Sequence, residues 1–156
     1  MSTMRSGVLF CLLAIVAIGC HKVPYDDMMN APQAVEIDDQ TFTLDGGAGR
    51  DFFGDPGGSG SPLVVIVTLT GSDTTKPMPS TPWADHVWVI RSPYEVWEAT
   101  LRPPSDTTSK YRIYYSATGG PKWPTGISVG VAALFRSGDG RTWLLRDPEV
   151  RISHSE

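Results

Sequence analysis

The stretch Leu63-Val-Val-Ile-Val-Thr-Leu69 decides the fold class, because six of its seven residues are apolar and β-branched residues dominate it. β-Branched side chains favour extended backbone. A continuous apolar run of this length predicts a strand that is buried on both faces.

Similar short runs recur outward from this stretch, separated by turn residues. They are Val35–Leu44, Val87–Ile90, Val96–Leu101, Tyr111–Tyr115, Ile127–Phe135, Thr142–Leu145 and, after a break at Asp147-Pro148, Val150–Ile152. We find no convincing amphipathic helix after residue 20. Seven or eight short strands predict an all-β fold, an antiparallel β-sandwich over residues 34–156.

Two hairpins allow predictions of register. A turn at Gly138-Asp-Gly140, with Gly140 left-handed, places Phe135 opposite Trp143 and Ala133 opposite Leu145. One face of that strand then becomes the candidate core, made of Ile127, Val129, Val131, Ala133 and Phe135. A loop of two or four residues around Ser92-Pro93 places Val89 opposite Val96 and Trp88 opposite Trp97.

The segment from Trp123-Pro-Thr-Gly126 to the closing strand resembles the last hairpin of immunoglobulin-like or fibronectin-type bacterial envelope domains. The resemblance covers roughly the last 35 residues and rests on pattern alone, so it implies an architecture and no activity.

The first twenty residues, MSTMRSGVLFCLLAIVAIGC, have the pattern of an export signal. Arg5 precedes the apolar run Val8–Ile18. Such a run covers about 16 Å of helix, roughly half the hydrocarbon thickness of a bilayer. It therefore favours a secretory signal peptide over a membrane-spanning helix.

The end of this run, Ala17-Ile18-Gly19-Cys20, resembles the lipobox of bacterial lipoproteins. In that family the Cys thiol receives a diacylglycerol, the chain is cut before the Cys, and the new amino terminus is usually acylated too. The resemblance implies that residues 1–19 are removed and that Cys20 is the lipid attachment site. Ala17 stands where the family most often has Leu, and an ordinary signal peptide or a retained anchor helix are the alternatives.

The cysteine count favours the lipoprotein interpretation. Cys11 lies inside the apolar run and would be removed with it, so Cys20 would be the one thiol left. A single thiol cannot form an internal disulfide in an oxidising compartment. The residue after Cys20 is His21 and not Asp, which resembles the sorting signal for an outer-membrane destination.

The charge of the chain excludes some partners and is unevenly distributed. A net charge of -4 argues against nucleic acid as a partner. Residues 21–55 carry eight acids against Lys22 and Arg50, whereas residues 56–156 are close to neutral. Residues 20–33 contain two prolines and little apolar periodicity, so we expect an acidic tether there.

We expect no catalytic site. His86 is the one histidine placed within a predicted strand region, its neighbour Asp85 fits a turn at Trp83-Ala-Asp85, and no Gly-x-Ser-x-Gly motif is present. Glu95 and Glu98 are three residues apart on a predicted strand and would point to opposite faces.

A metal site or a cofactor is not expected either. Residues 46–60 hold seven of the sixteen glycines and predict a long surface loop, pinned to the core by Phe52 and Phe53. Gly46-Gly-Ala-Gly-Arg-Asp51-Phe-Phe53 fits one copy of the calcium β-roll repeat, but at least about three copies are needed for stability. A looser calcium site would use Asp45, Asp51 and Asp55.

The sequence thus predicts a non-catalytic, lipid-anchored cell-envelope protein with a structural or protein-binding role, and favours the outer membrane. Its partners would be the membrane and an unknown envelope protein or glycan. One alternative is a carbohydrate-binding module, in which Trp88 and Trp97 form an aromatic strip for sugar rings. Packing of both tryptophans in the core is the competing explanation, and a calcium-binding module is the other alternative.

Overall fold

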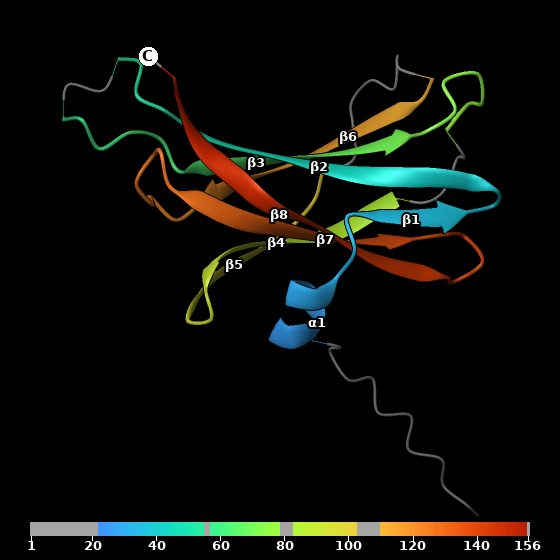
Figure 1. Cartoon of the computed structure of the whole chain (residues 1–156). Helices are drawn as coiled ribbons and strands as arrows, with labels where there is room; N and C mark the ends of the chain where they lie inside the picture. The colour runs from blue at the N-terminus through green and yellow to red at the C-terminus, as the bar shows by residue number, and fades with distance from the viewer. Residues whose placement is uncertain (1–21, 55–56, 79–82, 103–109, 156) are drawn as a thin grey trace, which may run out of the picture.

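The computed structural model describes residues 22–54, 57–78, 83–102 and 110–155 (Figure 1). One short helix, α1 (Tyr25–Asn30), precedes eight strands. The strands are β1 (Ala34–Ile37), β2 (Gln40–Asp51), β3 (Leu63–Gly71), β4 (Trp83–Ser92), β5 (Glu95–Thr100), β6 (Arg112–Gly120), β7 (Ser128–Arg136) and β8 (Thr142–Ser155). The expected all-β fold is therefore confirmed. Within these ranges, no helix is long and apolar enough to cross a membrane.

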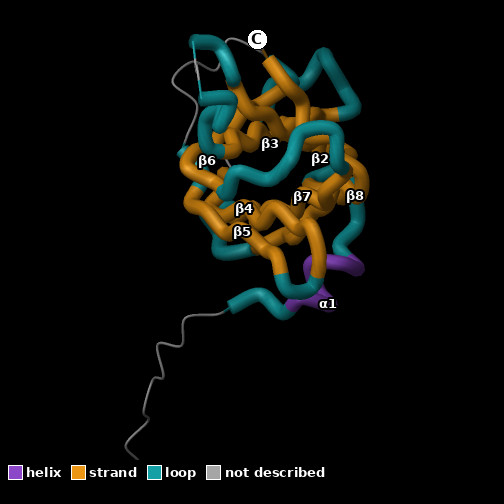
Figure 2. Tube along the Cα trace, turned by 90° about the vertical axis from the view of Figure 1, so that its left-hand side faces the viewer, coloured by secondary structure: helices purple, strands orange, loops and turns teal. Residues whose placement is uncertain are grey.

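The strands form one curled sheet in the order β5-β4-β7-β8-β2-β3-β6, with β1 beside β2. Its two ends lie over one another, and the core fills the space between them (Figures 1 and 2). The backbone N–H of Arg102, just after β5, donates to the carbonyl oxygen of Ser116 in β6 at 2.9 Å. The two edges of the sheet therefore meet at this point.

One junction is parallel, so the expectation of antiparallel pairing throughout is wrong. The first part of β8 pairs antiparallel with β7, and its last part, Ile152–Ser155, pairs parallel with Ala48–Asp51 of β2. A strand of 14 residues is long enough to change neighbours along its length. β8 thus joins the lower and upper parts of the sheet in Figure 1.

The predicted break at Asp147-Pro148 is a bulge inside β8 and does not end the strand. The β7–β8 register shifts between Val129 and Val131, opposite this dipeptide. Proline has no N–H to donate, and a bulge leaves a residue unpaired, so the two are compatible. Oδ2 of Asp147 accepts a 3.0 Å hydrogen bond from the backbone N–H of Gly46.

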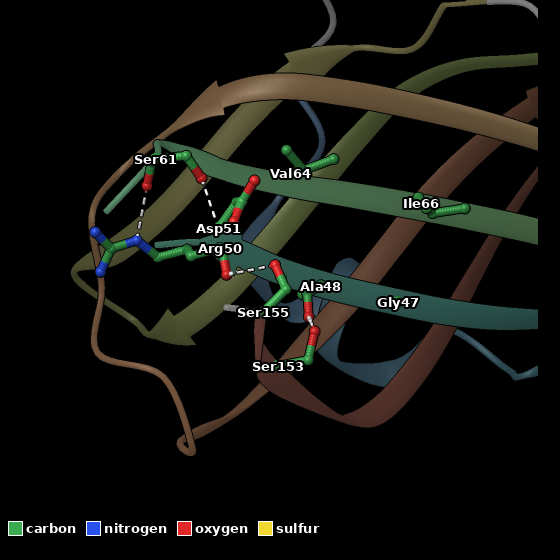
Figure 3. A pocket seen from close by; sticks show the side chains of 10 residues that line it. Gly47, Ala48, Arg50, Asp51, Ser61, Val64, Ile66, Ser153 and Ser155 are labelled. Carbon is green, nitrogen blue, oxygen red and sulfur yellow. Dashed lines mark hydrogen bonds between the residues drawn. The ribbon is translucent and has the colours of Figure 1, made fainter. Parts of the chain in front are cut away.

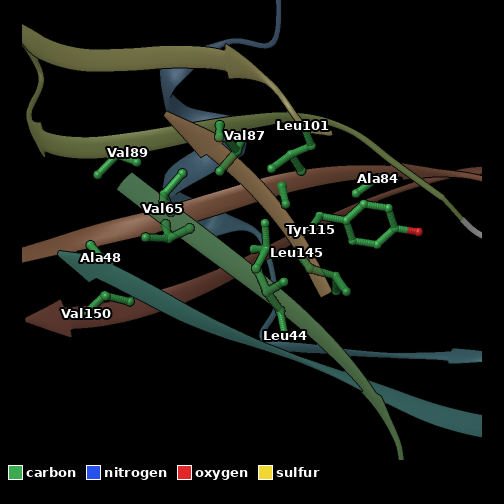
Figure 4. Close-up of a cluster of buried hydrophobic side chains, with 14 of the residues drawn as sticks. Leu44, Ala48, Val65, Ala84, Val87, Val89, Leu101, Tyr115, Leu145 and Val150 are labelled. Atoms are coloured by element: carbon green, nitrogen blue, oxygen red, sulfur yellow. The ribbon is translucent and has the colours of Figure 1, made fainter. Parts of the chain in front are cut away.

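The predicted register of the last hairpin is confirmed. Phe135 lies opposite Trp143, Ala133 lies opposite Leu145, and Gly140 has a φ of 86°. The predicted face of β7 is part of the core, which also takes in Leu44, Val65, Val87 and Tyr115 among others (Figure 4).

β3 is not buried on both faces, contrary to the sequence-based expectation. Its inward residues Leu63, Val65, Val67 and Leu69 are fully buried, whereas Ile66 on the outer face is 45% exposed. An antiparallel sheet with one open face normally shows this alternation. The apolar run continues across both faces, which is why composition alone suggested double burial.

The first six of the fifteen residues of the expected glycine-rich loop are strand. β2 extends to Asp51, so that only the residues between Asp51 and Leu63 connect strands there. A methyl group on Gly46 would lie 2.7 Å from Val150 Cγ2 and 3.1 Å from Val131 Cβ. Glycine at this position therefore lets β2 cross close to β7 and β8.

The expected tether over residues 20–33 is partly a docked helix. Met28 of α1 is buried in a small cluster with Trp88, Ile90 and Ala132 on the outer side of β4 and β7. Nη1 of Arg146 donates a 2.9 Å hydrogen bond to the carbonyl oxygen of Met29. This helix was not predicted, because six residues make fewer than two helical turns and show little periodicity.

Candidate functional site

The two candidate ligand-binding tryptophans lie on opposite faces of the sheet. Trp88 pairs with Glu98 and Trp97 pairs with Val89, so the expectation that the two rings face each other is wrong. Trp88 is 4% exposed beneath α1, and Trp97 packs against the main core. Its ring carbons would lie 2.7 Å from a methyl group on Gly120. The aromatic strip does not exist.

The hairpin turn explains this error. The two-residue loop is Pro93–Tyr94, and the register shifts again between Ile90 and Ser92. A shift of one residue moves every side chain of a strand to the other face. The combined turn and bulge therefore separate Trp88 from Trp97.

The candidate acid–base residues Asp85 and His86 lie in a partly exposed ion-pair cluster with Arg136. Asp85 lies within β4 and not in a turn, and the register shifts around it. Its Oδ2 accepts from Nε of Arg136 at 2.7 Å and lies 3.6 Å from Nδ1 of His86. Both side chains are about one-third exposed. Their position on an open strand suits a surface ion pair, which contributes little to stability.

The aspartates of the calcium hypothesis are dispersed. Asp45 and Asp51 are six residues apart along β2, which places them about 20 Å apart. Asp51 accepts a 2.9 Å hydrogen bond from the backbone N–H of Phe53, and Asp55 lies outside the described residues. No cluster of three metal-ligating side chains occurs in the described part of the chain.

A shallow groove lies on the outer face of β2 and β3, next to the end of β8 (Figure 3). Its floor follows from the strand register, because Gly47 lies opposite Ile66 and Gly49 lies opposite Val64. Glycine at these two alternate positions leaves the outer face of β2 without side chains between Asp45 and Asp51. Ser153 and Ser155 of β8 line the groove on one side of β2, and Ser61 lines it on the β3 side (Figure 3).

At one end of the groove, Arg50 connects β2 to two neighbouring loop segments through hydrogen bonds. Arg50 is 6% exposed. Its guanidinium donates to three carbonyl oxygens, from Nε to Ser61 at 2.8 Å, from Nη1 to Trp123 at 2.8 Å, and from Nη2 to Ser59. It also lies 4.9 Å from the centre of the Phe52 ring, which stacks on His154. Sequence reasoning missed Arg50, whose only signal was a single charge among glycines.

The serine hydroxyl groups of β8 in the groove contact backbone carbonyl oxygens. Ser153 Oγ donates to the carbonyl oxygen of Ala48 at 3.0 Å, and Ser155 Oγ donates to the carbonyl oxygen of Arg50 at 3.5 Å. These hydrogen bonds link β2 and β8 at their parallel junction. The surface of the groove beside them is open and weakly polar.

The remaining predicted site, Cys20, lies outside the described residues. The structure thus supplies a docked helix, a groove of small side chains and a buried arginine clamp, with the predicted tryptophan strip absent. Comparison with protein-family models and with curated protein sequences finds no match for the chain.

Proposed function

We propose that this chain is a lipid-anchored cell-envelope protein, made with residues 1–19 as a signal peptide and held to a bacterial membrane through Cys20. The lipobox-like sequence Ala17-Ile18-Gly19-Cys20 supports the proposal. The observation that carries it furthest is the short distance along the chain from Cys20 to α1, which begins at Tyr25. The helix thus begins five residues after the proposed attachment site.

The proposed role of the domain is structural or protein-binding, and not catalytic. In support, the groove on β2 and β3 is open to solvent, and the hydroxyl groups of Ser153 and Ser155 beside it donate to backbone carbonyl oxygens. The groove at Gly47, Gly49, Val64 and Ile66 is the best candidate surface for an envelope protein, because it is flat and partly apolar. An outer-membrane destination is proposed on the residue after Cys20 alone.

We also propose that the architecture is an immunoglobulin-like β-sandwich. It is supported by the two packed parts of the sheet, with β1, β2, β3 and β6 on one side and β4, β5, β7 and the first half of β8 on the other. The parallel pairing of β2 with β8 departs from the simple antiparallel form.

The two cysteines provide a matched test of anchoring. Cys20→Ser removes the proposed attachment site, and Cys11→Ser changes a cysteine that the proposal assigns to the discarded signal. After cell fractionation, we expect Cys20→Ser to leave the membrane fraction and Cys11→Ser to remain there with the wild type. Equal membrane retention of all three chains would overturn the proposal.

The groove is tested separately with a photocrosslinking residue at Ile66 and a control at Thr100, which is exposed on β5. A protein-binding role predicts a discrete envelope-protein adduct at position 66 that the control lacks. Identical crosslinking patterns at the two positions would remove the groove from the proposal.

A further inference from the structure

The hairpin between β4 and β5 lies on the same side of the molecule as α1. Figures 1 and 2 show both below the sheet, with the C-terminus on the opposite side. The side chains agree, because Val96 of β5 packs against the Trp88 cluster to which Val23 and Tyr25 also pack. The start of the ordered chain and the hairpin therefore share one face.

The most exposed large aromatic side chain of the described residues is at the tip of this hairpin. Tyr94 is 96% exposed, in the two-residue loop that follows Ser92. It lies two residues beyond Val96, and so projects past the cluster that holds the segment before α1. Because the Tyr94 ring is almost fully exposed, it would lose almost no contacts within the protein if it moved from water into a lipid layer.

The number of residues before α1 limits how far the proposed anchor can lie from this face. Lys22 is exposed and lies two residues after Cys20. Two extended residues span at most about 7 Å. A lipid on Cys20 would therefore enter the bilayer close to the face that carries Tyr94.

The charges on this face favour an aromatic contact over an electrostatic one. Lys22 and Arg91 are offset by three acids, which are Asp26 and Asp27 of α1 and Glu95, the last paired with Arg91 at 2.9 Å. Attraction to anionic lipid requires a cluster of basic residues, which is absent from this set. Tyrosine, by contrast, is enriched at membrane–water interfaces, where its ring and hydroxyl suit the headgroup layer.

We propose that Tyr94 is a second membrane contact, whose ring enters the headgroup layer of the leaflet that holds the Cys20 lipid. This inference rests on the proposed lipid anchor and adds to it an orientation. The hairpin and α1 face the bilayer, and the groove on β2 and β3 faces away from it. The partner of this surface is a lipid bilayer, and the contact depends little on salt.

Hydroxyl-radical footprinting tests this without changing any residue of the face. The lipidated full chain is placed in vesicles of phosphatidylethanolamine and phosphatidylglycerol, and the Cys20→Ser chain in solution is the reference. Oxidation of Tyr94 is compared by peptide mass spectrometry with that of Tyr114, which is 44% exposed on β6. We expect a several-fold loss of oxidation at Tyr94 in vesicles and no change at Tyr114.

The two proposals fail in different ways. Unchanged oxidation of Tyr94 in vesicles, on chains whose Cys20 carries lipid by mass, would overturn the membrane contact and leave the anchor intact. An unmodified Cys20 in the membrane-purified chain would overturn both. Protection of Tyr94 that disappears at high salt would also contradict the aromatic contact proposed here.

Discussion

Nη1 of Arg50 donates a hydrogen bond of 2.8 Å to the carbonyl oxygen of Trp123, 73 residues away in the chain. This contact joins the end of β2 to the connection between β6 and β7. The same guanidinium binds the carbonyl oxygens of Ser59 and Ser61, so one side chain fixes two connections. A planar guanidinium with five donors suits this task, and an ammonium does not reproduce it.

Arg50→Lys is therefore expected to destabilise the domain by about 2–4 kcal/mol, because it removes hydrogen bonds to three carbonyl oxygens, of which the bond to Trp123 is buried. Urea unfolding of a chain that starts at residue 20 and carries Cys20→Ser measures this. Arg151→Lys is the matched control, since Arg151 is exposed on β8, and a change within about 0.5 kcal/mol is expected there. Equal effects of the two substitutions would contradict the clamp.

Gly46→Ala is expected to cost about 1–3 kcal/mol, because the added methyl group meets Val150 and Val131 at 2.7 and 3.1 Å. Gly47→Ala is the neighbouring control, with Ile66 Cβ and the Ile66 carbonyl oxygen at 3.9 Å as its nearest contacts. Thermal unfolding should show a lowered Tm for Gly46→Ala alone. A similar Tm for both variants would show that β2 does not cross β8 this closely.

The turn between β1 and β2 offers a stabilising substitution. Asp38 and Asp39 have φ values of 48° and 61°, as a two-residue type I′ turn requires. Asp38 also accepts hydrogen bonds from Arg141, so Asp39 is the better position to change. Asp39→Gly should raise the free energy of unfolding by about 0.5–1 kcal/mol, measured in urea. Destabilisation would contradict the left-handed turn.

Asp139 links stability to acid pH. The hydrogen bond from the Ser137 hydroxyl, followed by those from the backbone and side chain of Arg141, lowers the pKa of this carboxyl below its ordinary 3.8. A lowered folded-state pKa contributes stability above the unfolded pKa, and that contribution is lost as pH falls through the folded pKa. The stability difference between wild type and Asp139→Asn should be constant above about pH 5 and shrink in more acid solution. A difference that does not vary with pH would contradict this linkage.

Local signals in the sequence predicted part of the fold. The predicted register of the β7–β8 hairpin was correct, because Gly140 in the left-handed conformation determines both the loop length and the register. The predicted register of the β4–β5 hairpin was wrong, because no residue pattern indicated the bulge between Ile90 and Ser92. This one register shift places Trp88 and Trp97 on opposite faces of the sheet, so they cannot form the predicted aromatic strip.

Long-range features could not be predicted from the sequence in the same way. The parallel pairing of Ala48–Asp51 with Ile152–Ser155 joins residues about 100 positions apart, and neither segment carries a signal for the other. The glycines at positions 46, 47 and 49 predicted a loop by composition. In the folded chain, Gly46 and Gly49 instead allow neighbouring strands to pass close to β2. The Arg50 clamp likewise depends on two connections that only the folded chain brings together.

The lipid anchor at Cys20 is the central claim, and mass spectrometry of the amino-terminal peptide from membrane-purified protein tests it most directly. The account predicts a chain that begins at Cys20 and carries the added mass of a diacylglycerol, with or without a further acyl chain. A chain that begins at Met1, or an amino-terminal Cys20 with no added lipid, would contradict it.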